Sequence, residues 1–216
     1  MDYDKLIENI SDKNVDVDYY VDLVLKDEDI KREVVKQLLN NNKIMVYYHC
    51  YYIISKSSEL KPEYFYEYWN DFVLLLKHKN SYHRSIALTI IGNLIKVDKE
   101  NYFEKIFDDY TSLFNDEKFM TAHCFVENCS KIINNCKQFS EELIDILLDV
   151  DKKCDYPDKQ RGLLKAAIIQ CFEDSYNFIE DKEKIHFFVK NQINSVSPKT
   201  RKKAKEFLKK NSDSNE

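Results

Sequence analysis

Apolar side chains recur along this chain with the spacing of a helix, and the spacing itself repeats. Five segments share one register, in which the fourth and eighth positions are mostly apolar and lie one helical turn apart. They are "YYHCYYII" (47–54), "RSIALTII" (84–91), "TAHCFVEN" (121–128), "RGLLKAAI" (161–168) and "RKKAKEFL" (201–208). The third and seventh positions add Ile86, Ile90, Leu163, Ala167 and Phe207 to the apolar stripe, and Glu127 and Asn128 are exceptions. The pattern predicts five helices that each bury one side.

A second apolar series lies between these segments. The stretch 62–79 opens with Pro62, which suits a first helical turn, and its buried stripe runs through Phe65, Trp69 and Phe72. Three further stretches show a similar pattern: 99–115, 140–154 with Ser140 as its expected cap, and 181–193. The chain therefore alternates A helices, from this series, with B helices, from the first.

Three more helices are predicted upstream, at 3–10, 15–26 and 28–40. We expect 28–40 to pair with the tyrosine-rich helix and the first two to form a terminal pair. Only two glycines and three prolines occur in 216 residues, so the tight turns of a sheet protein would lack their usual residues. The expected fold is all-α, with about twelve helices in six antiparallel pairs.

A helix-pair period of 37 to 40 residues resembles the HEAT-repeat family and the armadillo-like class around it. The segment "LLLKHKNSYHRSIALTIIGNLIK" (74–96) carries the resemblance, with an apolar helix end, a polar turn, an arginine and an alanine three residues later. Family members often place an acid six residues before that arginine, as Asp155 precedes Arg161, whereas His78 precedes Arg84. Tetratricopeptide arrays, with a period of about 34 residues, match less well.

The resemblance implies an α-α superhelix, a HEAT- or armadillo-like solenoid, that forms a single domain over 1–216. Within it, 1–27 would supply N-terminal capping helices, 28–211 the repeats and 212–216 a disordered tail. Because terminal repeats need a polar outer face, the excess of acids in 1–30 and of bases in 198–216 is expected for the two ends of such an array.

Two His–Cys pairs, His49–Cys50 and His123–Cys124, fall on the same repeat positions. Adjacent helical residues point about 100° apart, and no orienting acid or amide accompanies either pair, so we interpret both as packing residues rather than nucleophilic dyads. The small fourth-position residues, including Ala87 and Cys124, are expected where neighbouring helices approach closely.

The sequence offers little chemistry of the enzymatic kind. There is no Gly-rich phosphate loop, no His-Glu-x-x-His spacing and no Cys-x-x-Cys pair, so we expect no cofactor, no metal and no enzymatic activity. The amino terminus is acidic, and the longest apolar stretch, 86–95, is half the length of a membrane span. We therefore expect a cytoplasmic protein without a membrane partner, whose six cysteines are reduced.

An interaction scaffold is the function that these features favour, with a protein or peptide as partner and an oligomeric state that the sequence leaves open. Tyr48 and Tyr52 lie one turn apart, away from the buried stripe, and are candidate contact residues. The basic terminal helix adds Lys202, Lys205 and Lys209 as further candidates.

The alternative is a nucleic-acid-binding array, in particular one of the HEAT-like DNA-alkylation-repair glycosylases. The resemblance to them is one of architecture and length, and they hold an aromatic and acidic pocket over a basic groove. Trp69 and Asp71 form the one tryptophan–acid pair here, without a surrounding basic groove. The formal net charge of −5 disfavours nucleic acid as a partner.

Overall fold

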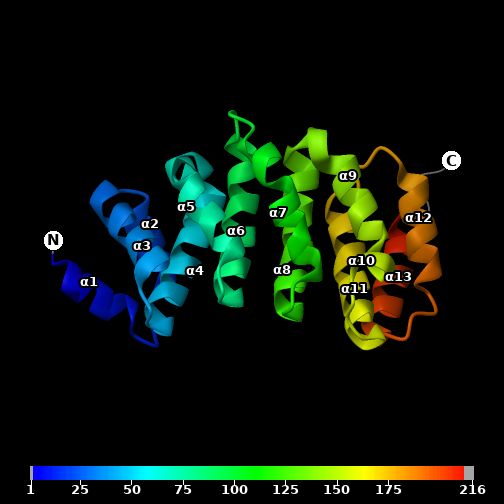
Figure 1. The fold of residues 1–216 in the computed structure, drawn as a ribbon, viewed down its shortest axis with the longest axis horizontal. Helices are drawn as coiled ribbons and strands as arrows, with labels where there is room; N and C mark the ends of the chain where they lie inside the picture. Colours follow the sequence, from blue (N-terminus) through cyan, green and yellow to red (C-terminus); the bar gives the residue numbers. More distant parts are fainter. Residues whose placement is uncertain (1, 212–216) are drawn as a thin grey trace.

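The chain folds into a row of helices that lie side by side, with the N-terminus at one end and the C-terminus at the other (Figure 1). The computed structural model describes residues 2–211, and within that range it contains helices and no strand. The α-helices are α1 (Tyr3–Ile10), α2 (Val17–Val24), α3 (Glu28–Asn40), α4 (Ile44–Leu60), α5 (Trp69–Leu74), α6 (Ser81–Leu94), α7 (Phe107–Ser112), α8 (Phe119–Asn135), α9 (Lys137–Leu148), α10 (Val150–Lys153), α11 (Asp158–Asp174), α12 (Lys182–Asn191) and α13 (Pro198–Lys210). Short 3-10 helices accompany them: η1 (Pro62–Tyr64), η2 (Tyr66–Tyr68), η3 (Leu75–Lys77), η4 (Ile95–Val97), η5 (Tyr102–Ile106) and η6 (Leu113–Asn115). The predicted all-α superhelix is confirmed.

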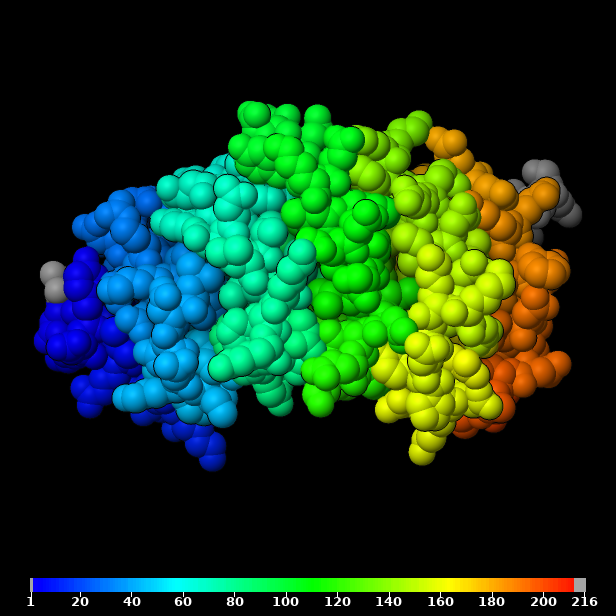
Figure 2. All heavy atoms as spheres, in the orientation of Figure 1, coloured from blue at the N-terminus to red at the C-terminus, as the bar shows by residue number. Residues whose placement is uncertain are grey.

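Two layers of helices make up the row. The B layer holds α4, α6, α8, α11 and α13, and each of them packs against the next. In the A layer, α3 lies on α4, α5 on α6, α9 on α8 and α12 on α13. The colours of the space-filling view follow one another in bands from one end to the other, so each repeat touches mainly its neighbours (Figure 2). This is the organisation of a helical solenoid.

The N-terminal helices α1 and α2 both lie against α4, which also pairs with α3 as predicted. The imidazole of His49, buried in α4, holds α1 in place because its Nδ1 lies 2.6 Å from the carbonyl oxygen of Ile10. His49 is therefore a packing residue, and Cys50 beside it is fully buried. The segment 212–216, for which we predict a disordered tail, lies outside the described residues.

Two of the predicted A helices are wound more tightly than expected. The stretch 62–79 contains one short α-helix between 3-10 segments, and 99–115 is built in the same way. A 3-10 helix places residues three apart on one side. Trp69, Phe72 and Leu75 follow that spacing, and all three are buried. The predicted continuous α-helices are wrong here, and spacing alone does not select the winding, since Phe65 and Leu76 are buried at intervals of four from Trp69 and Phe72.

The helix predicted at 140–154 begins earlier than expected. α9 starts at Lys137, and Ser140 lies inside it, buried, with no hydrogen-bond partner for its hydroxyl. Phe139 explains the earlier start, since its ring stacks on Phe107 with 4.5 Å between the ring centroids. The predicted cap at Ser140 is therefore wrong.

The register drawn through the five B helices is off by one residue in α8. Ala87 of α6 is fully buried, but Cys124, its predicted counterpart, is only half-buried, as is His123. Phe125 takes the inner position because its ring packs against two aromatic rings of the A layer. With α8 shifted by one residue, Asn128 corresponds to Ile90 of α6, so it remains a buried polar exception to the apolar pattern. The two His–Cys pairs are therefore not equivalent, although Cys124 still lies close to α6, with its Sγ 3.5 Å from the carbonyl oxygen of Ser85.

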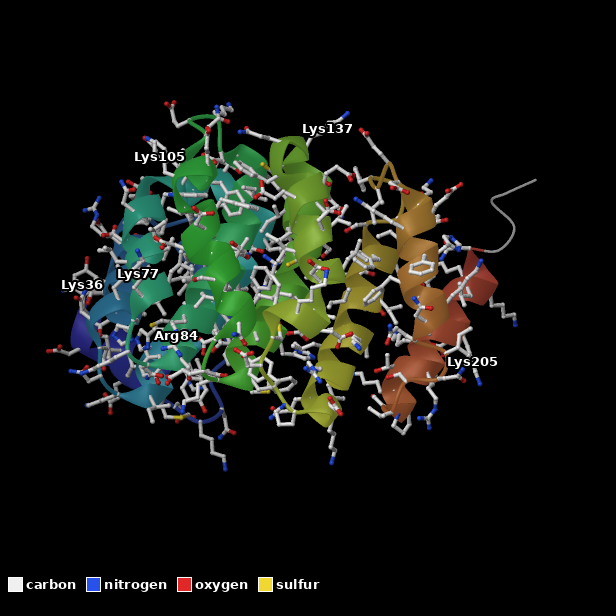
Figure 3. All side chains as sticks on the ribbon, turned by 45° about the vertical axis from the view of Figure 1, so that its right-hand side comes forward. Lys36, Lys77, Arg84, Lys105, Lys137 and Lys205 are labelled. Atoms are coloured by element: carbon white, nitrogen blue, oxygen red, sulfur yellow. The ribbon has the colours of Figure 1, made fainter. Side chains whose placement is uncertain are left out.

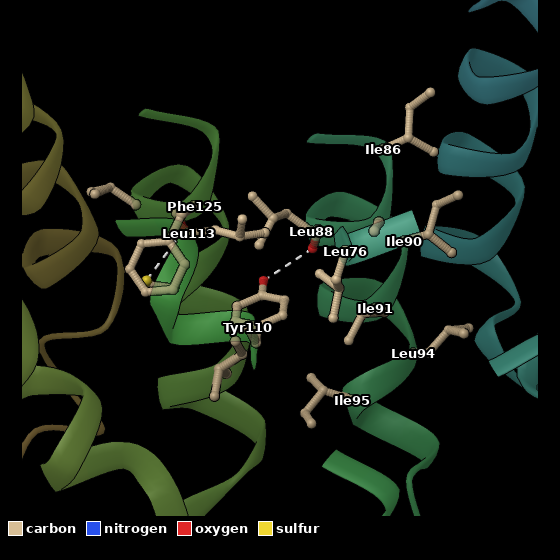
Figure 4. Close-up of a cluster of buried hydrophobic side chains, with 14 of the residues drawn as sticks. Leu76, Ile86, Leu88, Ile90, Ile91, Leu94, Ile95, Tyr110, Leu113 and Phe125 are labelled. Atoms are coloured by element: carbon tan, nitrogen blue, oxygen red, sulfur yellow. Dashed lines mark hydrogen bonds between the residues drawn. The ribbon is translucent and has the colours of Figure 1, made fainter. Parts of the chain in front are cut away.

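The interior between α6, α7 and α8 shows how the two layers are joined (Figure 4). Leu88, Ile91 and Leu94 of α6 are fully buried there, and so is Tyr110 of α7. The Tyr110 hydroxyl donates a hydrogen bond of 3.0 Å to the carbonyl oxygen of Leu88, so this polar atom enters the core with a partner. The contact between the two layers is therefore stabilised by apolar burial and by the hydrogen bond of the Tyr110 hydroxyl.

One joint between repeats is closed by a buried ion pair. Arg84, which is labelled in Figure 3, donates from Nε and Nη2 to both carboxylate oxygens of Asp116, at 2.6 and 2.8 Å. Its Nη1 donates to the carbonyl oxygen of His78 at 2.8 Å, six residues earlier. Arg201 of α13 repeats the latter bond, to the carbonyl oxygen of Ser195 at 2.8 Å. The arginine thus fastens the turn before its own helix, and at Arg84 it also fastens the next repeat.

The acid that the family resemblance places before Arg161 has another partner. Asp155 exchanges two hydrogen bonds with Asn115 of the preceding repeat, at 2.9 and 3.0 Å. Arg161 pairs instead with Asp158 in its own helix. This joint is therefore closed by an amide and a carboxylate rather than by the expected arginine and acid.

Overpacking of a B helix provides a test of the fold. Since Ala87 is fully buried, Ala87→Leu has to displace its neighbours and is expected to destabilise the chain by about 1–3 kcal/mol in urea unfolding. Lys153→Ala, on an exposed part of α10, is the control and should change the stability by less than about 0.5 kcal/mol. An unchanged midpoint for Ala87→Leu would show that α6 does not meet its neighbours closely at this point.

Removal of one partner from the buried ion pair gives a second test. Arg84→Met leaves the Asp116 carboxylate buried without its counter-ion, so we expect a loss of about 3–5 kcal/mol. The double variant Arg84→Met/Asp116→Leu removes the uncompensated charge and should recover a large part of that loss. If the single and double variants unfold at the same urea concentration, the pair does not join the two repeats.

Candidate functional site

The outward side of the five B helices, here called the B-helix face, is the surface that the repeats build together. Its middle helices carry small side chains, with Ser85 and Thr89 on α6 and Ala167 on α11. Over α11 the face is hollowed by about 250 Å³, and residues of α8, α11 and α13 line this hollow. Over α6, Glu59 of α4 acts through its charge on Lys131 of α8, two B helices away. The face is therefore hollowed over α11.

Four tyrosines form a cluster over α4 and α6. The ring centroid of Tyr48 lies 5.1 Å from that of Tyr52 and 5.9 Å from those of Tyr51 and Tyr82, with edge-on geometry. Burial, followed by the neighbouring Tyr52 hydroxyl, raises the pKa of Tyr48 to about 12. Tyr52 and Tyr82 remain 42% and 57% exposed. The tyrosine cluster thus offers two open rings that are held in place by a half-buried third.

Local sequence explains how the cluster forms. Tyr48, Tyr51 and Tyr52 are three and four residues apart, so they share one side of α4. Tyr82 enters from the first turn of α6, whose start is fixed because the Asn80 side chain accepts a hydrogen bond of 3.0 Å from the Tyr82 backbone N–H.

A line of polar side chains crosses the face below the cluster. The Tyr51 hydroxyl donates to Thr89 Oγ1 at 3.3 Å, and Asn128 Nδ2 donates to the same oxygen at 3.3 Å. These bonds connect α4, α6 and α8, so the face is fastened on its surface as well as in its core.

Lys131 lies one turn further along, in a half-buried position. Its ammonium donates a 2.6 Å hydrogen bond to Asn93 Oδ1, while Asn93 Nδ2 donates to Ser58 Oγ at 3.0 Å. Burial lowers the pKa of Lys131, the charge of Glu59 opposes this shift, and Lys96 adds to it. No carboxylate of residues 2–211 lies within ion-pair distance of Lys131.

The hollow over α11 carries charges of both signs. On the α8 side, Glu127 lies 3.4 Å from His123, and the hydrogen bond between them lowers the pKa of Glu127. On the α13 side, Lys203 donates a hydrogen bond to Gln170 Oε1 of α11, and Gln170 Nε2 donates to Asp174 at 2.7 Å. The hollow is a polar pocket between three successive B helices.

The structure brings some of the predicted contact residues together and separates the others. Tyr48 and Tyr52 meet in the tyrosine cluster, on the predicted side of α4. Lys202, Lys205 and Lys209 are exposed on α13, at the opposite end of the row, where Lys205 is labelled in Figure 3. The two groups therefore do not form one site.

Sequence reasoning missed Tyr82, Lys131 and Lys203 as surface residues of the repeats. Lys203 and His123 share the third position in the register drawn from the sequence and both line the hollow over α11, although the register of α8 is shifted by one residue. For Lys131 and Tyr82 no sequence signal exists, because their neighbours belong to other repeats.

The residues considered for chemistry lie elsewhere. Trp69 is buried beside the rings of Tyr66 and Tyr102, whereas Asp71 is exposed. The two residues therefore do not form the open aromatic and acidic pocket of a DNA glycosylase. Among residues 2–211 no three His, Cys, Asp or Glu side chains are placed to hold a metal ion, and all six cysteines are free. Burial raises the pKa of the Cys50 and Cys154 thiols to about 12. No helix of this part of the chain is both long and apolar enough to cross a membrane.

Comparisons with known proteins leave the family open. No protein-family model and no curated protein matches the chain. Among solved structures, the chain is similar to a designed armadillo repeat protein, YIII(Dq)4CqI, with 12% identity and a TM-score of 0.49 over 95% of this chain and 98% of the other. The description of the chain as a helical-repeat solenoid therefore depends on the two layers of stacked helices seen in its structure.

The two glycines of the chain test how closely the B helices meet. At Gly162 an added Cβ would lie 2.9 Å from Ser197 Cβ in the α13 cap, so Gly162→Ala is expected to cost about 1–3 kcal/mol. At Gly92 it would lie 3.3 Å from Lys131 Cδ, which belongs to a side chain that can shift. Gly92→Ala should therefore gain up to about 1 kcal/mol from its helix propensity. The free energy of unfolding of both variants in urea tests these values. A destabilised Gly92→Ala would show that the Lys131 side chain cannot shift.

Proposed function

We propose that the chain is a non-enzymatic scaffold that binds a protein or peptide along its B-helix face. The observation that carries the proposal is the tyrosine cluster, in which Tyr52 and Tyr82 are open to solvent and packed against Tyr48. A tyrosine ring supplies apolar contact area with a polar tip, and rings that are already ordered lose little freedom on binding. A face built by stacked repeats suits an extended partner.

The environment of the nucleophilic groups supports a non-enzymatic role. A reactive cysteine needs a lowered pKa, whereas burial raises the pKa of Cys50, Cys124 and Cys129. His49 is buried and its Nδ1 lies against the carbonyl oxygen of Ile10, so its ring serves the packing of α1. We extend the proposal to a reducing compartment such as the cytoplasm, in which six free cysteines are expected, and to a HEAT-like origin of the repeats.

The experiment is selection from a displayed library of random peptides, about twelve residues long, against the full chain. Such peptides span roughly 40 Å when extended, enough to cross several B helices. We expect a family of related sequences to be enriched, and their binding to fall at least about tenfold in Tyr82→Ala and Tyr52→Ala.

Tyr19→Ala is the matched control, because Tyr19 on α2 is 56% exposed and Tyr82 is 57% exposed. Far-UV circular dichroism confirms that each variant is folded. The proposal is wrong if no sequence family is enriched, or if the enriched peptides bind Tyr82→Ala and Tyr19→Ala equally well.

A further inference from the structure

Six lysines of residues 2–211 are buried or half-buried, and they differ in their partners; that of Lys182 is the ring of Tyr176. Lys31, Lys165 and Lys184 each contact a carboxylate, at 2.8, 2.7 and 2.7 Å. Lys131 and Lys203 contact only an amide oxygen, that of Asn93 and that of Gln170. A carboxylate neutralises an ammonium group, but an amide oxygen does not, so the hydrogen-bond partners of Lys131 and Lys203 leave their charge uncompensated.

Both of these lysines lie on the B-helix face. Each donates to a residue of the preceding B helix, Lys131 from α8 to α6 and Lys203 from α13 to α11. The amide orients the ammonium, which has three donors and leaves the others for a ligand. The stem of Lys131 lies over Gly92, the one glycine of α6, where no Cβ obstructs it.

The distance between the two ammonium groups follows from the order of the helices. α11 stands between α8 and α13 in the B layer (Figure 1), and packed helices are about 8–10 Å apart. The two groups are thus separated by roughly 20 Å, which equals about six residues of extended chain.

We propose that the ligand of this face is an extended acidic peptide that places one carboxylate on Lys131 and a second, about six residues away, on Lys203. The proposal rests on the peptide-binding function above and adds the charge and spacing of the partner. The tyrosine cluster lies further along the same face, because Tyr82 and Asn93, the partner of Lys131, are eleven residues or about 16 Å apart on α6.

Acids on the face argue for separate carboxylates rather than a nucleic-acid backbone. Glu59 lies within electrostatic range of Lys131, and Glu127 and Asp174 line the hollow that holds Lys203. A continuous row of phosphates would pass these acids and be repelled by them. A peptide can place its acids on the lysines and neutral residues between them.

The test uses the peptide selection described above and reads the composition of the enriched sequences. We expect two acidic positions about six residues apart. A synthetic copy of the leading sequence should bind the parent chain and lose at least about tenfold in affinity for Lys131→Met and for Lys203→Met. Lys153→Met, an exposed lysine of α10, is the control and should bind as the parent does.

A second variant removes the charge without removing the lysine. Gln170→Glu gives Lys203 a carboxylate partner of the same shape as the amide, so it should weaken acidic-peptide binding about as much as Lys203→Met does. This variant protects the test against a methionine variant that fails to fold, which circular dichroism would reveal.

The outcomes separate this inference from the proposed function. Enriched peptides that lack acids but depend on Tyr82 would overturn the acidic specificity and leave peptide binding intact. Enrichment of no sequence family would overturn both. A single-stranded oligonucleotide that binds the parent chain and competes with the peptide, with loss in Lys131→Met, would replace the acidic peptide by nucleic acid.

Discussion

Contact between neighbouring B helices is the constraint on which the rest of this molecule depends. A single helix pair cannot bury its apolar side alone, so each B helix has to be covered by the next one along the row. Leu88, Ile91 and Leu94 are fully buried for this reason, although α6 is only 14 residues long. The same contact creates the B-helix face, because the outward sides of helices packed in this way form one continuous surface.

Polar bonds between repeats set the helix order as firmly as the apolar core does. The Arg84–Asp116 pair, the Asn115–Asp155 pair and the line from Tyr51 to Asn128 each join residues of different repeats. Arg84 and Asp116 are buried, and a buried charge costs free energy unless its partner is in place, so this pair disfavours other registers of the two repeats. The face is consequently presented in a defined shape before any ligand arrives.

Much of the fold could be predicted from the sequence, since helical periodicity is a local property. The A and B alternation, the pairing of α3 with α4 and the packing role of His49 all follow from residues close in the chain. The register of α8 could not be predicted, because it depends on the contact of Phe125 with Tyr110 and Phe114, which lie in the preceding A helix. The same holds for the site. The contact between Tyr48 and Tyr52 could be predicted because both lie on one helix, whereas the contact of Lys131 with Asn93 joins two repeats and could not.

The 3-10 winding of the A layer has a consequence for how the repeat can change in length. A 3-10 helix rises about 2.0 Å per residue and an α-helix about 1.5 Å, so fewer residues can span the same distance in the A layer. An added or lost residue there can be absorbed by a change in winding. In a B helix it would rotate every later side chain by about 100° and turn groups such as Thr89 or Lys131 away from the face. A change in residue number is therefore expected to be tolerated better in the A layer than in the B layer, where it would turn the side chains of the B-helix face.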